Sequence, residues 1–454
     1  MSPAPGIDRG RSAGEAPGSR PGLLVEGARE IVTMAGGLRR GAAQGQAASL
    51  SASDGGLEVA CWEGRFVLAG RRDDVARRLA ADGLDPADGA RFACLDVAGG
   101  TVTPGLIDPH THLVFAGSRE NEIELRRRGA TYLEILAAGG GILSTVAATR
   151  RASVDDLTAS GHRWLREMLR HGATTVEAKS GYGLERDAEL RQLEAIGRLD
   201  AEGPTELVPT FLGAHAVAPE FRDRPDATDA YVRDVIDVQL PAVAAQGIAR
   251  FCDVFCEQGV FTAEQSRRVL LAGARLGLGL RLHADELRPS GGAELAAELG
   301  AAAADHLGVP SPAGIDALAG VADAGTPVVA TLLPATSLFL KGDEYGPARE
   351  LIDRGVPVAL GTDFNPGTSP APNLQLVLSL AVLRMGLTPL EALAGVTVNA
   401  AHALRLGDSH GTIEPGRQAD LVAWDVPGIG QIPYWLGAGL VRAVVKRGRV
   451  VAFD

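Results

Sequence analysis

From residue 106 to residue 405, short apolar runs alternate with longer amphipathic stretches, and this alternation constrains the fold most strongly. Each apolar run has the length of a strand, and the stretches between them have the spacing of helices. Such an order is typical of an α/β protein with a parallel sheet or barrel. Eight strand candidates can be counted, at residues 102–109, 174–178, 207–212, 251–255, 278–282, 301–304, 328–332 and 356–360. The order of these elements predicts a (β/α)8 barrel of the TIM type.

The clearest helix candidates have a polar residue at their start or a glycine close beyond their end. They cover residues 154–171, 186–201, 226–246, 263–276 and 373–385. No internal repeat of fixed period is visible, which argues against a solenoid or a propeller. The barrel prediction therefore rests on the order of the elements alone.

The sequence pattern at both ends of the chain differs from that of residues 106–405, because short β-type runs are separated there by turns. We expect residues 22–105 and 406–454 to form one composite β-sandwich domain beside a barrel of residues 106–405. Residues 1–21 are rich in Pro, Gly, Ser and Arg and are expected to form a disordered tail. Residues 41–56 are expected to form a flexible loop.

The composition is that of a globular protein and excludes several classes of function. With 46% hydrophobic and 22% charged residues, the 454-residue chain can bury a large core. Its net charge of −12 argues against nonspecific binding to nucleic acid or to an anionic membrane. Residues 1–12 lack the apolar core of a signal peptide, and no uncharged apolar run reaches about 18 residues. The four cysteines do not resemble a disulfide framework, so we expect a cytoplasmic protein.

Histidines and an aspartate follow several of the predicted strands. His110 and His112 close the first strand, and because side chains alternate along a strand, both imidazoles point to the same side. His283, His306 and Asp363 each end a later apolar run. The carboxyl ends of barrel strands meet on one face, where functional residues of such barrels collect. We therefore expect these five side chains to lie together.

Imidazoles with a carboxylate are ligands that suit zinc or ferrous iron, with a coordination position left open for water. A second ion would need a bridging group, such as a carbamylated lysine after the fourth strand, but residues 253–257 contain no lysine. Lys179 follows the second strand instead and is either a structural charge or a group that lines the pocket. One divalent metal ion, zinc or iron, is therefore predicted, while Glu257 keeps a second, weaker site open as an alternative.

A candidate for proton transfer lies just past the fifth strand. Glu286 follows His283 by three residues, where the strand should open into its loop. A carboxyl group there could carry a proton between water and a ring nitrogen. Asp285 is the competing candidate for this role, and either acid could instead be a solvated loop residue.

Several segments resemble the metal-dependent amidohydrolase superfamily, namely residues 104–112, 361–363 and 411–425. A closer resemblance, to a branch that opens an imidazolone ring in histidine degradation, rests on residues 112–119, 177–184, 211–216, 253–257, 283–286 and 362–368. It implies hydrolysis of the cyclic amide of 4-imidazolone-5-propanoate to N-formimidoyl-L-glutamate, in a homodimer. The polar tail and the inserted loop depart from this pattern, but no site residue is lost.

The resemblance also implies the roles of individual residues. The metal ligands would be His110, His112, His283 and Asp363. A mechanism then follows as a hypothesis: Asp363 would help to deprotonate the attacking water, His306 and the metal would stabilise the oxyanion, and Glu286 would deliver a proton to the departing nitrogen. The sequence leaves open whether Asp363 or Glu286 takes the first proton. The substrate, a small molecule with a carboxylate, would be bound by Arg119, Tyr182, His215, Glu286, Asn365, Gly367 and Thr368.

Other interpretations of the same residues remain open. Arg119 could form a surface salt bridge with its acidic neighbours, Tyr182 could pack in its loop, and His215 and Asn365 could be hydrogen-bonded at strand ends. For the whole chain, one alternative is a mononuclear aminohydrolase, a deaminase of a purine or pyrimidine, which would use the same ligand layout. The other is a metal-binding scaffold that has the barrel but no turnover.

Overall fold

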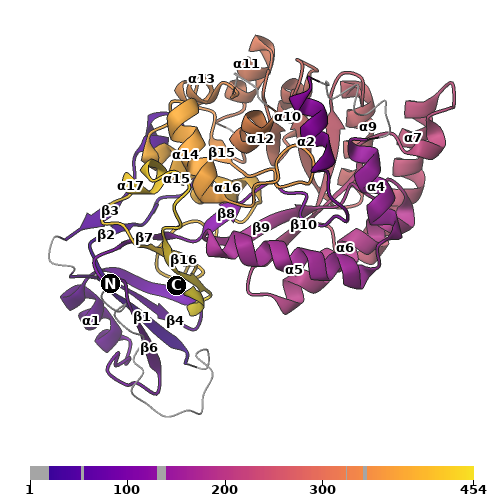
Figure 1. The fold of residues 1–454 in the computed structure, drawn as a ribbon. Coiled ribbons are helices and arrows are strands. Elements are labelled where there is room, and N and C mark those ends of the chain that lie inside the picture. The colour runs from indigo at the N-terminus through magenta and orange to yellow at the C-terminus, as the bar shows by residue number, and fades with distance from the viewer. Residues whose placement is uncertain (1–19, 53–55, 130–139, 324, 341–344, 454) are drawn as a thin grey trace.

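The computed structural model describes residues 20–52, 56–129, 140–323, 325–340 and 345–453 (Figure 1). Its centre is a parallel sheet of eight strands in the order β15-β14-β13-β12-β11-β10-β9-β8, with helices around the outside. The strands are β8 Leu106–Asp108, β9 Ala173–Lys179, β10 Glu206–Ala214, β11 Phe251–Cys256, β12 Gly279–Ala284, β13 Ala303–His306, β14 Val329–Leu332 and β15 Val358–Leu360. The predicted α/β barrel fold is confirmed.

The first and last strands, β8 and β15, meet just beyond their carboxyl ends. The amide of Asp363 donates to the carbonyl of His110 at 3.1 Å, and the amide of His112 donates to the carbonyl of Phe364 at 2.9 Å. Below these bonds, the hydroxyl and amide of Thr362 both donate to the carboxylate of Asp108. The sheet thus closes into a barrel through the segments that carry predicted metal ligands.

The predicted helices are present, with small changes at their ends. They are α5 Val154–Arg170, α6 Arg186–Glu202, α7 Ala227–Asp234, α8 Leu240–Gln246, α9 Ala263–Arg275 and α14 Leu374–Arg384. The helix predicted over 226–246 is interrupted by a π-helical turn, Val235–Gln239, just before Pro241. Proline lacks an amide hydrogen and clashes with the preceding turn, which accounts for the local widening.

Further helices lie in connections where no helix was predicted. They are α2 Asn121–Arg127, α4 Ile142–Arg151, α10 Gly292–Leu299, α11 Pro312–Gly320, α12 Pro334–Phe339, α13 Ala348–Asp353, α15 Pro389–Gly395, α16 Val398–Ala403 and α17 Gln431–Tyr434. Each of them spans ten residues or fewer, a length at which the apolar periodicity of a helix is weak. None of the helices in the described part of the chain is long and apolar enough to cross a membrane.

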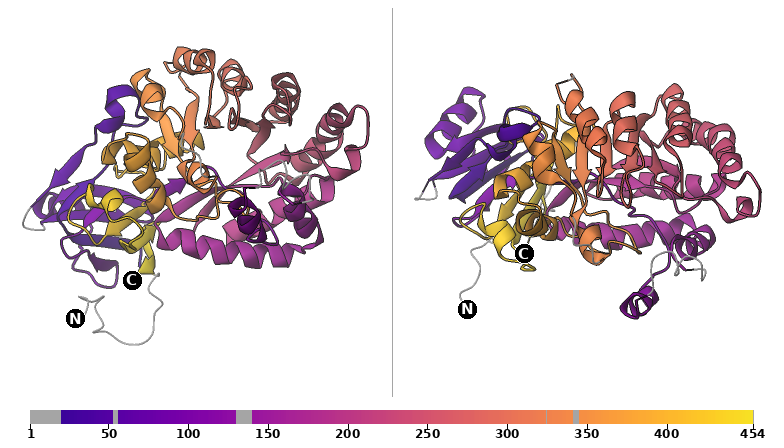
Figure 2. Two further views of the ribbon diagram at one scale, coloured as in Figure 1. Left: turned by 45° about the horizontal axis from the view of Figure 1, so that its top comes forward. Right: turned by 90° about the horizontal axis from the view of Figure 1, so that it is seen from above.

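Both ends of the chain build a β-domain beside the barrel (Figure 2). One sheet has the order β5-β4-β1-β6, and the other has the order β18-β17-β16-β7-β2-β3, so strands from the two ends pair directly. The N-terminal strands are β1 Gly22–Ala28, β2 Glu30–Val32, β3 Ser49–Ser51, β4 Leu57–Trp62, β5 Arg65–Arg71, β6 Phe92–Asp96 and β7 Thr101–Pro104. The C-terminal strands are β16 Leu421–Trp424, β17 Val441–Lys446 and β18 Arg449–Phe453.

The strands of this β-domain alternate their side chains as amphipathic strands should. In β1, Leu23 and Val25 belong to a core shared with the other sheet. Leu24, between them, instead packs with Val75 and Leu79 of helix α1, Arg72–Ala81, on the outer face. The composite domain predicted from the two chain ends is thus present, whereas its boundaries at residues 105 and 406 stay predictions.

The expectation of a flexible loop over 41–56 is wrong for most of that segment. Residues Gly41–Gly45 form a 3-10 helix, and β3 follows it. Gln44 is fully buried, and its side chain exchanges two hydrogen bonds with the backbone of Val358 in β15, at 3.0 and 3.1 Å. These bonds satisfy polar groups that would otherwise be hydrogen-bonded to water. A prediction from composition alone could not foresee them. The predicted tail lies almost entirely outside the described residues.

Candidate active site

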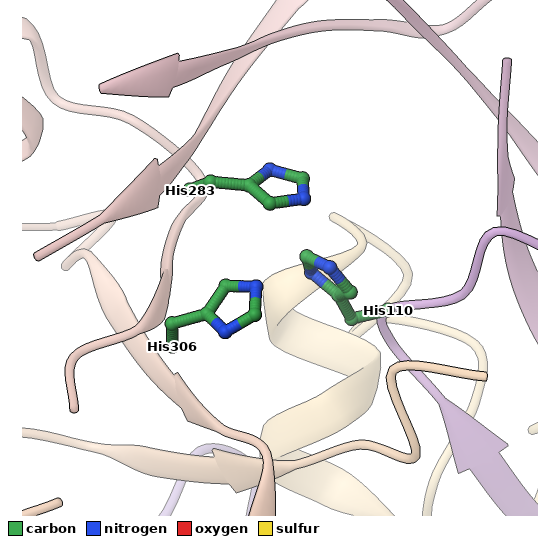
Figure 3. A group of neighbouring side chains, drawn as sticks. All are labelled: His110, His283 and His306. Carbon is green, nitrogen blue, oxygen red and sulfur yellow. The ribbon is translucent and has the colours of Figure 1, made fainter. Parts of the chain in front are cut away.

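Three histidine rings converge at the carboxyl ends of the barrel strands (Figure 3). His110 follows β8, His283 lies in β12 and His306 ends β13. The ring centroids of His110 and His283 are 4.6 Å apart, those of His283 and His306 are 5.1 Å apart, and those of His110 and His306 are 5.3 Å apart. All three side chains are buried. The prediction that these strand ends meet agrees with this geometry.

The ligand atoms lie at the spacing of a metal coordination sphere. Nε2 of His112 is 3.3 Å from Nε2 of His283 and 3.4 Å from Oδ1 of Asp363, which is itself 3.5 Å from Nε2 of His110. Ligands at about 2.0–2.1 Å from a tetrahedral zinc ion are separated by about 3.3–3.4 Å. Nε2 of His110 and Oδ1 of Asp363 are buried and have no hydrogen-bond partner among the described residues. Buried orphan atoms of this kind fit a metal ion.

Two carboxylates hold the far nitrogens of two of these histidines. Asp305 lies 2.8 Å from Nδ1 of His110, and Asp253 lies 3.1 Å from Nδ1 of His283. A carboxylate that accepts the Nδ1 proton leaves the Nε2 lone pair directed at a metal, a common arrangement around metal-binding histidines. Sequence analysis assigned no role to either aspartate. The available signal was a charged residue inside an apolar strand, which is rarely buried without a partner.

Lys179 lies inside the barrel beneath these aspartates and is fully buried. Its ammonium group is 2.8 Å from Glu177 and 2.8 Å from Asp253. The sequence left two roles open for Lys179, a structural charge or a group that lines the pocket. The buried ion pairs fit the structural charge. Glu257 accepts hydrogen bonds from the amide of Leu287 and the hydroxyl of Ser290, and it belongs to none of the metal-compatible groups among the described residues. The alternative of a second ion at Glu257 therefore gains no support.

Asp363 and His306 occupy unusual backbone conformations. Their φ angles are 50° and 74°, in the left-handed region that costs free energy for residues other than glycine. Oδ2 of Asp363 accepts a hydrogen bond from the hydroxyl of Thr336 at 2.7 Å, so Oδ1 faces the histidines. Burial raises the pKa of Asp363 to about 7. Burial also lowers the pKa of His306 well below its usual value, with a further contribution from His283.

The two adjacent acids after β12 have different surroundings. Asp285 accepts hydrogen bonds from the amides of Ser290, Gly292 and Ala293, and so it caps the start of α10. Glu286 instead faces the site, with Oε2 at 3.7 Å from Nε2 of His306. Burial, and then the charge of Asp363, raises the pKa of Glu286 well above its usual value. Because Glu286 faces the site and Asp285 does not, Glu286 is the better candidate for a proton donor.

Arg119 is buried, in contrast to the surface position considered above. Its guanidinium forms two hydrogen bonds with Glu122, at 2.9 and 2.8 Å, and both side chains are only 5% exposed. The guanidinium also lies against Gly367, where an added Cβ would be 1.9 Å from Nη1. Gly367 follows Asp363 by four residues, so the structure brings Arg119 close to a loop that carries a predicted metal ligand.

The remaining predicted pocket residues fall into two groups. Tyr182 and His215 lie beside His112, with ring centroids 5.7 and 5.0 Å from it, and Nδ1 of His215 is 3.0 Å from the carbonyl of Gly181. Burial, and then His283, lowers the pKa of His215 to about 3.

Asn365 instead shapes its own loop. Its side chain accepts hydrogen bonds from the amides of Gly367 and Thr368 and donates to the carbonyl of Asp363. The hydroxyl of Thr368 also lies 2.9 Å from the amide nitrogen of this side chain. These bonds fit the alternative in which Asn365 is hydrogen-bonded at a strand end. A contact of Asn365 or Thr368 with substrate stays a prediction.

A cavity of about 850 Å³ lies elsewhere, between the barrel and the β-domain. Its lining includes Gly203 and Pro204, which precede β10 and so mark the amino-terminal end of the barrel. Catalytic residues of (β/α)8 enzymes lie at the opposite, carboxyl-terminal end. The histidine cluster, and not this cavity, is therefore the candidate active site.

The barrel, its β-domain and the histidine-aspartate cluster agree with comparisons against known families. The model of the amidohydrolase family matches residues 101–451, which is more than half of the chain. The chain therefore belongs to the amidohydrolase family. A zinc-bound adenosine deaminase from Xanthomonas campestris is similar with a TM-score of 0.65 at 19% identity, over 94% of this chain and 92% of that one. At this identity, the likeness shows the fold alone.

Closer relatives narrow the assignment. An imidazolonepropionase of Geobacillus kaustophilus (strain HTA426) is 50% identical over 432 residues, which are 95% of this chain and 98% of that protein. An imidazolonepropionase of Alkaliphilus metalliredigens (strain QYMF) is 51% identical over 363 residues, 80% of this chain and 84% of that protein. Within the amidohydrolase family, the chain belongs with the imidazolonepropionases.

Proposed function

We propose that the protein hydrolyses the cyclic amide of 4-imidazolone-5-propanoate to N-formimidoyl-L-glutamate, a step of histidine degradation. The observation that carries this proposal is the 50% identity to an imidazolonepropionase over 95% of the chain. The deaminase alternative is supported by fold likeness alone, to deaminase structures such as an adenosine deaminase at 19% identity. A scaffold without turnover is less well supported, because every residue predicted for metal binding and proton transfer is present at one site.

We propose that His110, His112, His283 and Asp363 bind one divalent ion, zinc or iron. The geometry favours one ion over two. The proposed ligand atoms lie at the spacing of a single coordination sphere. Glu257, the candidate for a second site, belongs to none of the metal-compatible groups among the described residues.

A bound ion of this kind lowers the pKa of water and polarises a carbonyl group. The protein's own residues then move the protons. Glu286, whose pKa is raised by burial and which faces His306, is suited to donate to the departing ring nitrogen. Asp363 is the better placed first acceptor of the two, because its Oδ1 lies among the proposed ligand atoms. His306 is neutral because burial lowers its pKa, and it can still donate one N–H to a developing oxyanion.

We further propose that Arg119 binds the propanoate of the substrate. A guanidinium forms strong paired hydrogen bonds with carboxylates, and these are strongest away from water. Burial of Arg119 and its fixed position on Glu122 support this role, because a preorganised cation needs no reorganisation when the substrate arrives. Tyr182 and His215 are proposed to pack against the imidazolone ring from the side of His112.

One experiment separates the three candidate functions. The protein is purified with metal analysis, and the loss of imidazolonepropanoate absorbance is compared with ammonia release from purines and pyrimidines. We expect about one divalent ion per chain and turnover of imidazolonepropanoate only. Ammonia release from a nucleobase with stable imidazolonepropanoate would select the deaminase, and a metal-loaded protein inactive in both assays would select the scaffold. A homodimer is also proposed, on the resemblance alone, and gel filtration tests it. A cytoplasmic location is proposed because the four cysteines do not resemble a disulfide framework.

A further inference from the structure

Lys179 is a rare and unusually placed residue. The chain contains only three lysines, and Lys179 lies fully buried at the end of β9, inside the barrel. Its ammonium group is 2.8 Å from Glu177, 2.8 Å from Asp253 and 3.7 Å from Asp305. Removing an ammonium group from water is costly, so its retention here requires these partners. The arrangement raises the question of what the charge does.

The two aspartates next to Lys179 are those that hold the metal-site histidines. Oδ2 of Asp253 lies 2.8 Å from the lysine and 3.1 Å from Nδ1 of His283. Oδ2 of Asp305 lies 3.7 Å from the lysine and 2.8 Å from Nδ1 of His110. One ammonium group therefore stands behind two of the histidine ligands, with one carboxylate between it and each ring.

Lys179 also holds the segment between the other pair of ligands. Its backbone amide donates to the carbonyl of Thr111, the residue between His110 and His112, at 3.0 Å. Glu177, paired with the lysine, accepts a hydrogen bond from the amide of Thr111 at 3.1 Å. The hydroxyl of Thr111 in turn donates to the carbonyl of Glu177 at 2.6 Å. The end of β9 thus fixes the His110–His112 segment relative to the two aspartates.

We propose that Lys179 is a positioning residue of the metal site. Its ammonium group attracts Asp253 and Asp305 to one point and thereby directs Nε2 of His283 and of His110 at the metal ion. Arg281 cannot replace it, because among the ion pairs of the described residues Arg281 reaches Asp305 but not Asp253. Without the ammonium group, two buried carboxylates would repel each other, and the rings that they hold would lose their common direction.

The inference rests on the proposed function, because it presupposes a metal ion at these histidines. The test therefore measures metal binding directly in the full-length protein. Zn²⁺ affinity of Lys179→Met is determined by competition with a chromophoric chelator, and the visible spectrum of the Co²⁺-loaded protein reports ligand geometry. We expect about tenfold weaker Zn²⁺ binding and a changed Co²⁺ spectrum, since partners behind metal ligands typically contribute about 10- to 100-fold in affinity.

The chain offers a matched control in Lys446. This lysine is also buried, and it pairs with two carboxylates, Asp420 at 2.8 Å and Glu206 at 3.1 Å, but at the other end of the barrel. Lys446→Met should lose stability in a similar way and keep the wild-type Zn²⁺ affinity and Co²⁺ spectrum. Weaker Zn²⁺ binding in both methionine variants would overturn the proposal, because it would reflect general loosening.

Lys179→Met could fail to fold, since it leaves uncompensated buried carboxylates. The double variant Lys179→Met/Glu177→Gln removes one charge of each sign, keeps the side-chain volumes and leaves both Asp253 and Asp305 in place. We expect the same loss of Zn²⁺ affinity in it. Wild-type affinity in a folded Lys179 variant would refute the positioning role while leaving the proposed function intact. A wild-type protein that binds no divalent metal would instead refute the proposed function.

Discussion

Substitution of Gly367 by alanine offers a sharp test of the carboxylate-binding role of Arg119. An added Cβ would lie 1.9 Å from Nη1 and 2.3 Å from Cζ of Arg119. Nonbonded atoms settle at about 3.5–4.0 Å, so the guanidinium must move by roughly 1.5 Å. The obstructing group is the far end of a flexible side chain, so the fold can tolerate the change. The guanidinium of Arg119, however, must leave its wild-type position.

The cost of this shift can be worked from the hydrogen bonds. Arg119 is held by two bonds to Glu122 at 2.9 and 2.8 Å, and an aligned pair with a substrate carboxylate needs the guanidinium placed within about 0.5 Å. Loss of a charge-assisted hydrogen bond amounts to about 1.5–3 kcal/mol. This corresponds to roughly a 10- to 100-fold decrease in kcat/KM. We expect this decrease to appear mostly as a higher KM, because the substrate carboxylate is bound in the ground state and in the transition state alike.

Steady-state kinetics on imidazolonepropanoate measure this effect, with metal content and thermal unfolding followed in parallel. The matched control is Gly320→Ala, where an added Cβ meets nothing within 4 Å. It should retain wild-type KM. A folded, metal-loaded Gly367→Ala protein with KM within about twofold of wild type would refute the placement of the substrate carboxylate at Arg119.

Further predictions concern proton transfer, metal affinity and the segment near residue 44. Glu286→Gln should keep its metal and KM but lose about 100- to 10,000-fold in kcat, and full turnover would exclude Glu286 as proton donor. Because the donor must be protonated, wild-type kcat should fall as pH rises through the elevated pKa of Glu286, and a pH–rate profile that keeps this alkaline limb in Glu286→Gln would contradict the assignment. Zn²⁺ binding must displace the proton of Asp363, whose pKa is about 7, so affinity should be roughly tenfold weaker at pH 6 than at pH 8 in chelator competition; equal affinities would speak against Asp363 as a ligand. Gln44→Ala should lower the free energy of unfolding by about 1–3 kcal/mol in denaturant titrations, because it removes the acceptor of the buried Val358 amide, and an unchanged midpoint would argue against that contact.

The sequence predicted the fold well because the barrel strands are almost entirely buried. Runs such as those ending at His283 and at Asp363 carry a strong apolar signal, and parallel order places their ends on one face. The metal-ligand candidates could be found for the same reason, since each follows such a run. The composite β-domain could be predicted because both chain ends show short β-type runs separated by turns.

What the sequence did not predict depends on contacts between distant segments. Asp253 and Asp305 meet histidine rings that are distant along the chain, and spacing along the chain does not encode such a pairing. Asp285 and Glu286 are adjacent, and only the position of α10 assigns one to a helix cap and the other to the site. Gln44 lies in a segment of polar, small residues whose order comes from hydrogen bonds to β15.

The junction of β8 and β15 gives the metal site a mechanical role as well. The ring of strands closes there through backbone bonds of His110, His112, Asp363 and Phe364, and three of these residues are proposed ligands. A bound ion would therefore act as a reversible cross-link between the first and last strands of the barrel. Local opening should begin at this seam when the ion is removed, and amide hydrogen exchange at His112 and Asp363 should accelerate before exchange in β10 or β11.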